Sequence, residues 1–131
     1  MFDSTIQIYI IDDEPSICTA YARLARSARM EARTFGSVGE FLAADCSDEN
    51  ACVISEARMP GASGLELPAL LAGVRRDLPV IIVTAHDTSE MREAARQAGA
   101  AAYFRKPVDD QALLDAVSWA MSRRRPNAPH S

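Results

Sequence analysis

The segment "IQIYIIDDEP" at residues 6–15 decides the fold. Residues 6–11 form a short apolar run rich in β-branched side chains, which is typical of a buried strand. The run ends abruptly at Asp12-Asp13-Glu14, and Pro15 suits the first turn of a helix. We therefore predict a buried strand whose C-terminal end carries acids, followed directly by a helix over about residues 15–29.

The same alternation of strand and helix continues along the chain. Apolar β-type runs alternate with segments of helical periodicity, and turn residues separate them. A series of this kind predicts a parallel sheet with helices on both faces and right-handed crossovers. The further strands are expected at 31–35, 51–55, 79–84 and 101–104, and the further helices at 37–44, about 67–74, 87–97 and 109–122.

Local signals give finer expectations for three of these helices. Ser37 and Glu40 have the spacing of a capping box, and so do the residues of the stretch 87–90. Asp109 is expected to cap the last helix. In the helix near 67–74, four residues at helical spacing predict a stripe that faces the core: Leu67, Leu70, Leu71 and Val74.

Polar groups follow the ends of four predicted strands: Asp12 and Asp13, then Glu56, Thr84 and Lys106. The carboxyl ends of parallel strands meet at one edge of a sheet, so these side chains are expected to lie together. Acids crowded at one place repel one another unless a cation intervenes, and Mg²⁺ is the natural hard cation for carboxylates. The lysine supplies a second positive charge, and the threonine a hydrogen-bond donor for an anion.

Composition bounds the class of protein. The 131 residues fit one domain, and the net charge of −4 gives no basic footprint for nucleic acid. Cys18, Cys46 and Cys52 have no metal-type spacing, which favours reduced structural thiols. The N-terminus is no secretory signal and no apolar run is long enough to span a bilayer. We expect a cytoplasmic protein with no membrane association.

Four short motifs now carry a resemblance. They are "IIDDE" at 10–14, "MPGASG" at 59–64, "VTA" at 83–85 and "YFRKP" at 103–107. In this order and spacing they resemble the receiver domain of two-component response regulators, from about Gln7 to Met121. The resemblance implies a flavodoxin-like, doubly wound sheet of five parallel strands in the order 2-1-3-4-5. It places a receiver domain at 1–122 and a basic, Pro-containing tail or linker at 123–131.

The resemblance also implies roles for the residues at the strand ends. Asp12 and Asp13 would hold Mg²⁺, together with the side chain at position 56 and the backbone carbonyl of Arg58. Lys106 would contact the oxygens of a phosphoryl group.

A second set of implied roles concerns switching. Thr84 would move to bond a phosphoryl oxygen, and Tyr103 would swing inward as it moves. Arg58 and His86 occupy the variable positions that tune the rates of phosphorylation and dephosphorylation. The partner would be a sensor histidine kinase or another signalling protein, and a second copy could pair through the 87–122 surface. The sequence looks closest to receivers that precede a helix-turn-helix domain, so DNA contact would need a separate output domain.

Glu56 departs from the family pattern, which has the phosphoacceptor Asp three residues before Met59-Pro60. The longer side chain displaces its carboxylate by about one C–C bond, roughly 1.5 Å. A displacement of about that size can cost on the order of a hundredfold in rate. Three interpretations remain open: an atypical receiver that takes little or no phosphate and partly mimics the active state, a receiver that forms a glutamyl phosphate, and an engineered replacement of a native Asp. The first is preferred.

Two further classes of protein were weighed against a receiver. A small phosphohydrolase like the haloacid dehalogenases would also use an acidic cleft, but it needs an Asp nucleophile and an insert over the site, and neither is present. A receiver-like adaptor without phosphate chemistry overlaps the preferred interpretation. We therefore expect no enzymatic activity and no catalytic residue.

Overall fold

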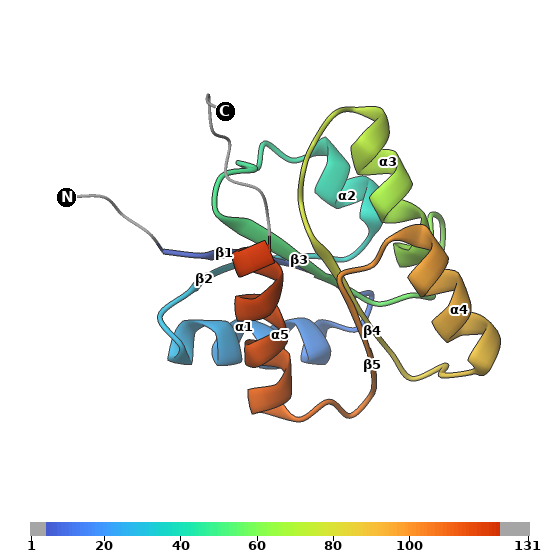
Figure 1. Ribbon diagram of the computed structural model, residues 1–131. Coiled ribbons are helices and arrows are strands. Elements are labelled where there is room, and N and C mark those ends of the chain that lie inside the picture. The colour runs from blue at the N-terminus through green and yellow to red at the C-terminus, as the bar shows by residue number, and fades with distance from the viewer. Residues whose placement is uncertain (1–4, 124–131) are drawn as a thin grey trace.

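The computed structural model describes residues 5–123 (Figure 1). Strands and helices alternate along this part of the chain, and their positions agree with the predicted ones to within a few residues. The strands are β1 Gln7–Ile11, β2 Glu31–Phe35, β3 Ala51–Ser55, β4 Val80–Thr84 and β5 Ala102–Arg105, and the helices are α1 Pro15–Ser27, α2 Val38–Ala43, the 3₁₀ turn η1 Gly64–Glu66, α3 Leu67–Gly73, α4 Ser89–Ala98 and α5 Asp110–Arg123.

The five strands form one parallel sheet in the order β2-β1-β3-β4-β5. This confirms the predicted α/β class and the strand order. In the register of the sheet Ile11 pairs with both Phe35 and Ser55, and Thr84 pairs with Arg105. The residues that follow these strand ends therefore share one edge of the sheet.

Helices cover both faces of the sheet, with α1 and α5 on one face and α2, α3 and α4 on the other (Figure 1). Successive strand residues point to opposite faces. Tyr9 and Ile11 accordingly belong to the core on the α2–α3–α4 side, whereas Ile8 and Ile10 belong to the core on the α1–α5 side. Each fully buried aliphatic side chain stabilises the fold by about 1.5–3 kcal/mol, so this double core holds the strand ends in place.

The predicted apolar stripe of α3 is wrong for two of its four residues. Leu67 and Leu71 are buried, but Leu70 is 39% exposed and Val74 is 61% exposed. The helix ends at Gly73, so Val74 lies beyond it. A helix of two turns presents only one narrow row of side chains to the sheet, and Leu70 falls outside that row.

Two predicted capping boxes form only in part. Ser37 accepts a hydrogen bond from the N–H of Glu40 at 3.0 Å, but the Glu40 carboxylate accepts from the N–H of Gly36. At α4 the cap is Thr88. Asp87 lies just before it and makes other contacts, described below. Asp109 does cap α5 as predicted, because its carboxylate accepts from the N–H of residue 112 at 2.9 Å.

The C-terminal region is described up to the end of α5. That helix reaches Arg123, one residue past the predicted domain boundary. The rest of the predicted tail lies outside the described residues. Within residues 5–123, no helix combines the length and apolar character needed to cross a membrane.

Candidate functional site

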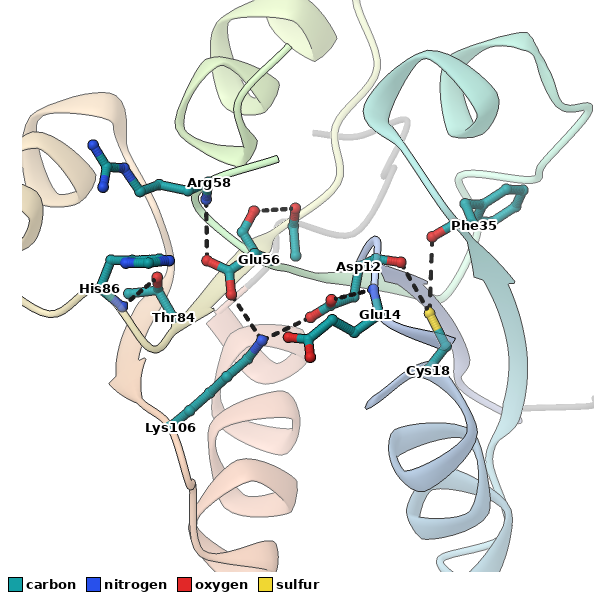
Figure 2. A network of polar contacts seen from close by, with 10 residues as sticks. Asp12, Glu14, Cys18, Phe35, Glu56, Arg58, Thr84, His86 and Lys106 are labelled. Carbon is teal, nitrogen blue, oxygen red and sulfur yellow. Dashed lines mark hydrogen bonds and ion pairs between the residues drawn. The ribbon is translucent and has the colours of Figure 1, made fainter. Parts of the chain in front are cut away.

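Lys106 lies between two carboxylates at the carboxyl edge of the sheet (Figure 2). Its ammonium Nζ is 2.8 Å from Oδ2 of Asp12 and 2.7 Å from Oε1 of Glu56. The three side chains are only 11%, 2% and 6% exposed, respectively. The Lys106–Pro107 peptide bond is cis. The structure therefore brings together three of the residues predicted to meet here, from three different strand ends.

The charges of this group reinforce one another. Burial on its own raises the pKa of Glu56, but hydrogen bonds from Lys106, Thr84 and the backbone of Arg58 outweigh burial and lower it. Burial on its own lowers the pKa of Lys106, but Asp12 and Glu56 outweigh burial and raise it. Glu56 is thus a carboxylate and Lys106 an ammonium at neutral pH.

Asp12 is positioned by the start of α1. Its Oδ1 accepts a hydrogen bond from the N–H of Glu14 at 2.9 Å, and its backbone carbonyl accepts one from the thiol of Cys18 at 3.3 Å. The first of these bonds closes a turn of the kind that Asp side chains form with the backbone two residues on. One oxygen of Asp12 is therefore fixed by the backbone, and the other faces Lys106.

Glu56 is held from its second oxygen as well. Oε2 accepts from the N–H of Arg58 at 3.0 Å, and the nearby Thr84 hydroxyl helps to lower the pKa of the carboxyl. The Thr84 oxygen in turn accepts from the N–H of His86 at 3.1 Å. Both oxygens of Glu56 thus have protein partners, so the carboxylate is satisfied without any bound ligand.

The loop after Glu56 is pressed against the end of β3. Gly64 donates to the carbonyl of Ala57 at 3.0 Å, and the hydroxyl of Ser63 donates to the same carbonyl at 2.6 Å. A Cβ at position 64 would lie 2.1 Å from the carbonyl oxygen of Glu56 and 2.6 Å from Oγ of Ser55. Only glycine permits this approach, which fixes the backbone from which Glu56 projects.

The residues predicted to hold Mg²⁺ are only partly assembled. Asp13 is exposed, and the inward oxygens of Asp12 and Glu56 face Lys106. Across residues 5–123, no three His, Cys, Asp or Glu side chains are grouped in a way that could hold a metal ion. The carboxylate chemistry of the set fits a hard cation, but the lysine ammonium stands between the donors.

The remaining predicted residues lie around this centre. The contact of Arg58 with the site comes from its backbone N–H, and the predicted metal contact of its carbonyl stays a prediction. His86 is exposed at the mouth of the site. Tyr103 lies half-buried on β5, and its hydroxyl donates to Oδ1 of Asp87 at 2.9 Å. The contact of Asp87 with Tyr103 could not be predicted from the sequence, because an Asp just before a helix is most often its cap.

A hollow of about 460 Å³ opens beside the centre. It does not include Asp12, Glu56 or Lys106, so it adjoins the charged group and is separate from it. Its lining comes from the loop after β3, the β4–α4 loop and the first turns of α4: Arg58, Leu65, Ala85, His86, Asp87, Thr88, Glu90, Met91 and Ala94.

Comparison with curated proteins finds regulators. Nodulation protein W of Bradyrhizobium diazoefficiens is 35% identical over 118 residues, which cover 90% of this chain and 52% of that protein. Transcriptional regulatory protein TdiR of Thauera aromatica is 36% identical over 118 residues, with the same coverage. The chain thus spans about half the length of these relatives.

Comparison with solved structures finds receivers. The crystal structure of FixJ-N matches with a TM-score of 0.83 and 28% identity, covering 94% of this chain and 97% of that one. A response regulator receiver protein from Burkholderia phymatum matches with a TM-score of 0.77 and 38% identity, covering 93% and 99%. The family model described as the response regulator receiver domain matches residues 8–118. The sequence of this chain, its fold and the residues at its strand ends together place it in the family of response regulator receiver domains.

Proposed function

We propose that this chain is an atypical receiver module of a phosphorelay, held by Glu56 in a state that does not depend on phosphate. One observation carries the proposal: the Lys106 ammonium binds Glu56 and Asp12 at once, at 2.7 and 2.8 Å. In this arrangement a protein ammonium, and not a ligand, pairs with both carboxylates of the site. The module then acts by binding other proteins and has no turnover of its own.

Phosphoryl transfer to Glu56 is expected to be slow or absent. An attacking carboxylate oxygen must have a lone pair in line with the donor, and a displacement of about 1.5 Å can cost on the order of a hundredfold. Here Oε1 is bound by Lys106 and Oε2 by the N–H of Arg58. Attack would therefore have to use the remaining lone pair of an oxygen that these bonds already hold in place.

The same contacts support partial mimicry of the phosphorylated state. Lys106 and Thr84 are the two side chains that family resemblance assigns to the phosphoryl oxygens; Lys106 bonds to Glu56, and Thr84 helps to lower the pKa of Glu56. The mimicry is incomplete in charge. A phosphoryl group carries about −1.5 to −2 and three acceptor oxygens, by analogy with phosphorylated side chains, whereas Glu56 supplies one charge and two oxygens.

We propose weak Mg²⁺ binding by Asp12, Asp13 and Glu56, with the Arg58 carbonyl as a further ligand. When bound, the ion would supply a second positive charge at the cluster of acids. It would compete with Lys106 for the same carboxylate oxygens, and this competition is the reason that binding is expected to be weak.

The proposed partners are a sensor histidine kinase or another signalling protein, and a second copy bound through the surface of α4, β5 and α5. Two observations support an output elsewhere. The relatives are about twice as long as the matched region, and one is named a transcriptional regulatory protein. Any contact with DNA would therefore come from a separate output domain. Rate tuning by Arg58 and His86 belongs to this proposal, since both border the site.

Incubation with acetyl phosphate and Mg²⁺, followed by intact mass measurement, tests the proposal. The wild type should gain nothing, and Glu56→Asp should gain one phosphoryl group. The matched control is Glu90→Asp, the same change at an exposed position on α4, and it should behave as the wild type. A phosphoryl group on Glu56 of the wild type would refute the phosphate-independent state, and an inert Glu56→Asp would refute an intact receiver site.

A further inference from the structure

One carboxylate oxygen joins three elements on the side of the site that faces α4. Oδ1 of Asp87 accepts a hydrogen bond from the hydroxyl of Tyr103 at 2.9 Å and from Nε of Arg92 at 2.9 Å. Asp87 belongs to the loop between β4 and α4, Tyr103 to β5 and Arg92 to α4. The bond to Arg92 spans five residues and the bond to Tyr103 sixteen, so the second arises only from the tertiary fold.

The loop that carries Asp87 is fixed to the site at its other end. Thr84 helps to lower the pKa of Glu56, and its hydroxyl oxygen accepts from the N–H of His86, the residue that precedes Asp87. At the far side of Asp87, Thr88 caps α4 by accepting from the N–H of residue 91 at 3.0 Å. The five-residue stretch 84–88 therefore runs from the strand end beside Glu56 to the start of α4, with a hydrogen bond at each of its ends.

Tyr103 has an apolar body and a polar tip in this setting. Its ring packs against the core on the α2–α3–α4 side, beside a buried region that includes Ala95 of α4. Burial, together with the hydrogen bond to Asp87, raises the pKa of Tyr103 to about 12. The bonds from Arg92 and Tyr103 lower the pKa of Asp87. The acceptor is therefore a charged carboxylate, and a charged acceptor makes a stronger hydrogen bond than a neutral one.

We propose that Asp87 is the positioning residue for Tyr103, and that it holds the tyrosine against α4 in the orientation set by the Glu56 site. The contact between Asp87 and Tyr103 stands without any assumption about function. Its meaning for signalling rests on the proposed function, because Tyr103 and α4 form part of the proposed partner surface.

The first experiment removes the charge of Asp87. The full chain is labelled at the tyrosine Cζ carbon with ¹³C, and the ionisation of Tyr103 is followed by NMR from about pH 9, below the ordinary tyrosine pKa of about 10, up to the wild-type pKa of about 12. In Asp87→Asn, Tyr103 should ionise at least about one pH unit earlier than in the wild type, since a nearby negative charge disfavours the phenolate. Glu93→Gln removes another carboxylate of α4, one paired with Arg96 on the exposed face, and should leave Tyr103 unchanged. Identical Tyr103 titration in the wild type and Asp87→Asn would overturn the inference.

The second experiment cuts the connection to the site. Thr84→Val removes the hydroxyl that accepts from the N–H of His86 and helps to lower the pKa of Glu56. The Tyr103 signal should then move toward its position in Asp87→Asn, and an unmoved signal would overturn the link between Tyr103 and the site. Neither experiment involves phosphate. A failed mass experiment would refute the proposed function, whereas a failed titration would refute the role of Asp87.

Discussion

Replacing Lys106 with Met should turn the centre of the site from attractive to repulsive. Methionine keeps the length and apolar stem of lysine but lacks the ammonium. Because Oδ2 of Asp12 and Oε1 of Glu56 both contact the same nitrogen, at 2.8 and 2.7 Å, these two oxygens lie at most about 5.5 Å apart, the sum of the two distances. At an effective dielectric constant of about 20, two unit charges at that separation repel by about 3 kcal/mol. We expect Lys106→Met to lower the free energy of unfolding by about 3 kcal/mol, at the lower end of the range for a broken buried pair.

Urea unfolding with and without a second substitution measures this directly. At about pH 8, well above the ordinary carboxyl pKa values, adding Glu56→Gln to Lys106→Met removes one of the two repelling charges. The double variant should therefore be more stable than Lys106→Met alone, although Glu56→Gln by itself destabilises the wild type. Millimolar Mg²⁺ should stabilise Lys106→Met more than the wild type, because the competing ammonium is gone. The matched control is Arg105→Gln, which removes an exposed neighbouring cation and should cost no more than about 0.5 kcal/mol.

The reasoning would be refuted by a double variant that is less stable than Lys106→Met. That result would mean that the carboxylates do not repel once the lysine is removed, and so that Lys106 does not neutralise them. A loss as small as that of Arg105→Gln would lead to the same conclusion.

Three further predictions follow from the same contacts. The pKa of Glu56 is lowered, so its contribution to stability is present above the ordinary glutamate pKa of about 4.3 and is lost as pH falls through the folded value. Below about pH 4, the free energy of unfolding of Glu56→Gln should therefore depend less on pH than that of the wild type. The pKa of Lys106, the only lysine in the sequence, is raised, so its contribution to stability persists above the ordinary lysine pKa of about 10.4 and is lost only as pH rises through the folded value. The single ¹⁵Nζ NMR signal should therefore still be that of an ammonium at about pH 10.4. A lysine that is half deprotonated at that pH would contradict the ion pairs. Gly64→Ala should destabilise the chain by more than about 1 kcal/mol, the usual cost of a point substitution, because the added Cβ would lie 2.1 Å from the Glu56 carbonyl oxygen. A melting temperature equal to that of the wild type would contradict this close approach.

The general layout of the site could be predicted from the sequence because it follows from strand pairing. Each buried strand ends at a polar residue, and parallel pairing in register brings those ends to one edge. That reasoning placed Asp12, Asp13, Glu56, Thr84 and Lys106 together. The structure confirms that Lys106 contacts Asp12 and Glu56, and Thr84 helps to lower the pKa of Glu56, whereas Asp13 is exposed. Backbone periodicity fixes where a strand ends, and the side chain at that end is read directly from the sequence.

The details that sequence reasoning missed depend on side-chain directions. The sequence indicates a lysine near acids, but only the fold shows that its ammonium lies where a metal ion was expected. The role of Asp87 depends on Tyr103, which comes from another strand, and local spacing favoured a helix cap. Leu70 and Val74 were predicted to face the core because helical spacing cannot show how short α3 is or how little of it the sheet covers.

On the proposed function, one methylene group at Glu56 exchanges reactivity for stability. Its carboxylate reaches Lys106 with one oxygen and the N–H of Arg58 with the other, so no ligand is needed to satisfy it. A shorter acid at this position would withdraw its oxygens by roughly 1.5 Å and would lose or lengthen at least one of these bonds. The vacated space and the released ammonium are what a phosphoryl group would use. Active sites commonly sacrifice stability in this way, and on our proposal the longer acid reverses the exchange, because the oxygens that phosphoryl transfer would need are those that Lys106 and the N–H of Arg58 already bind.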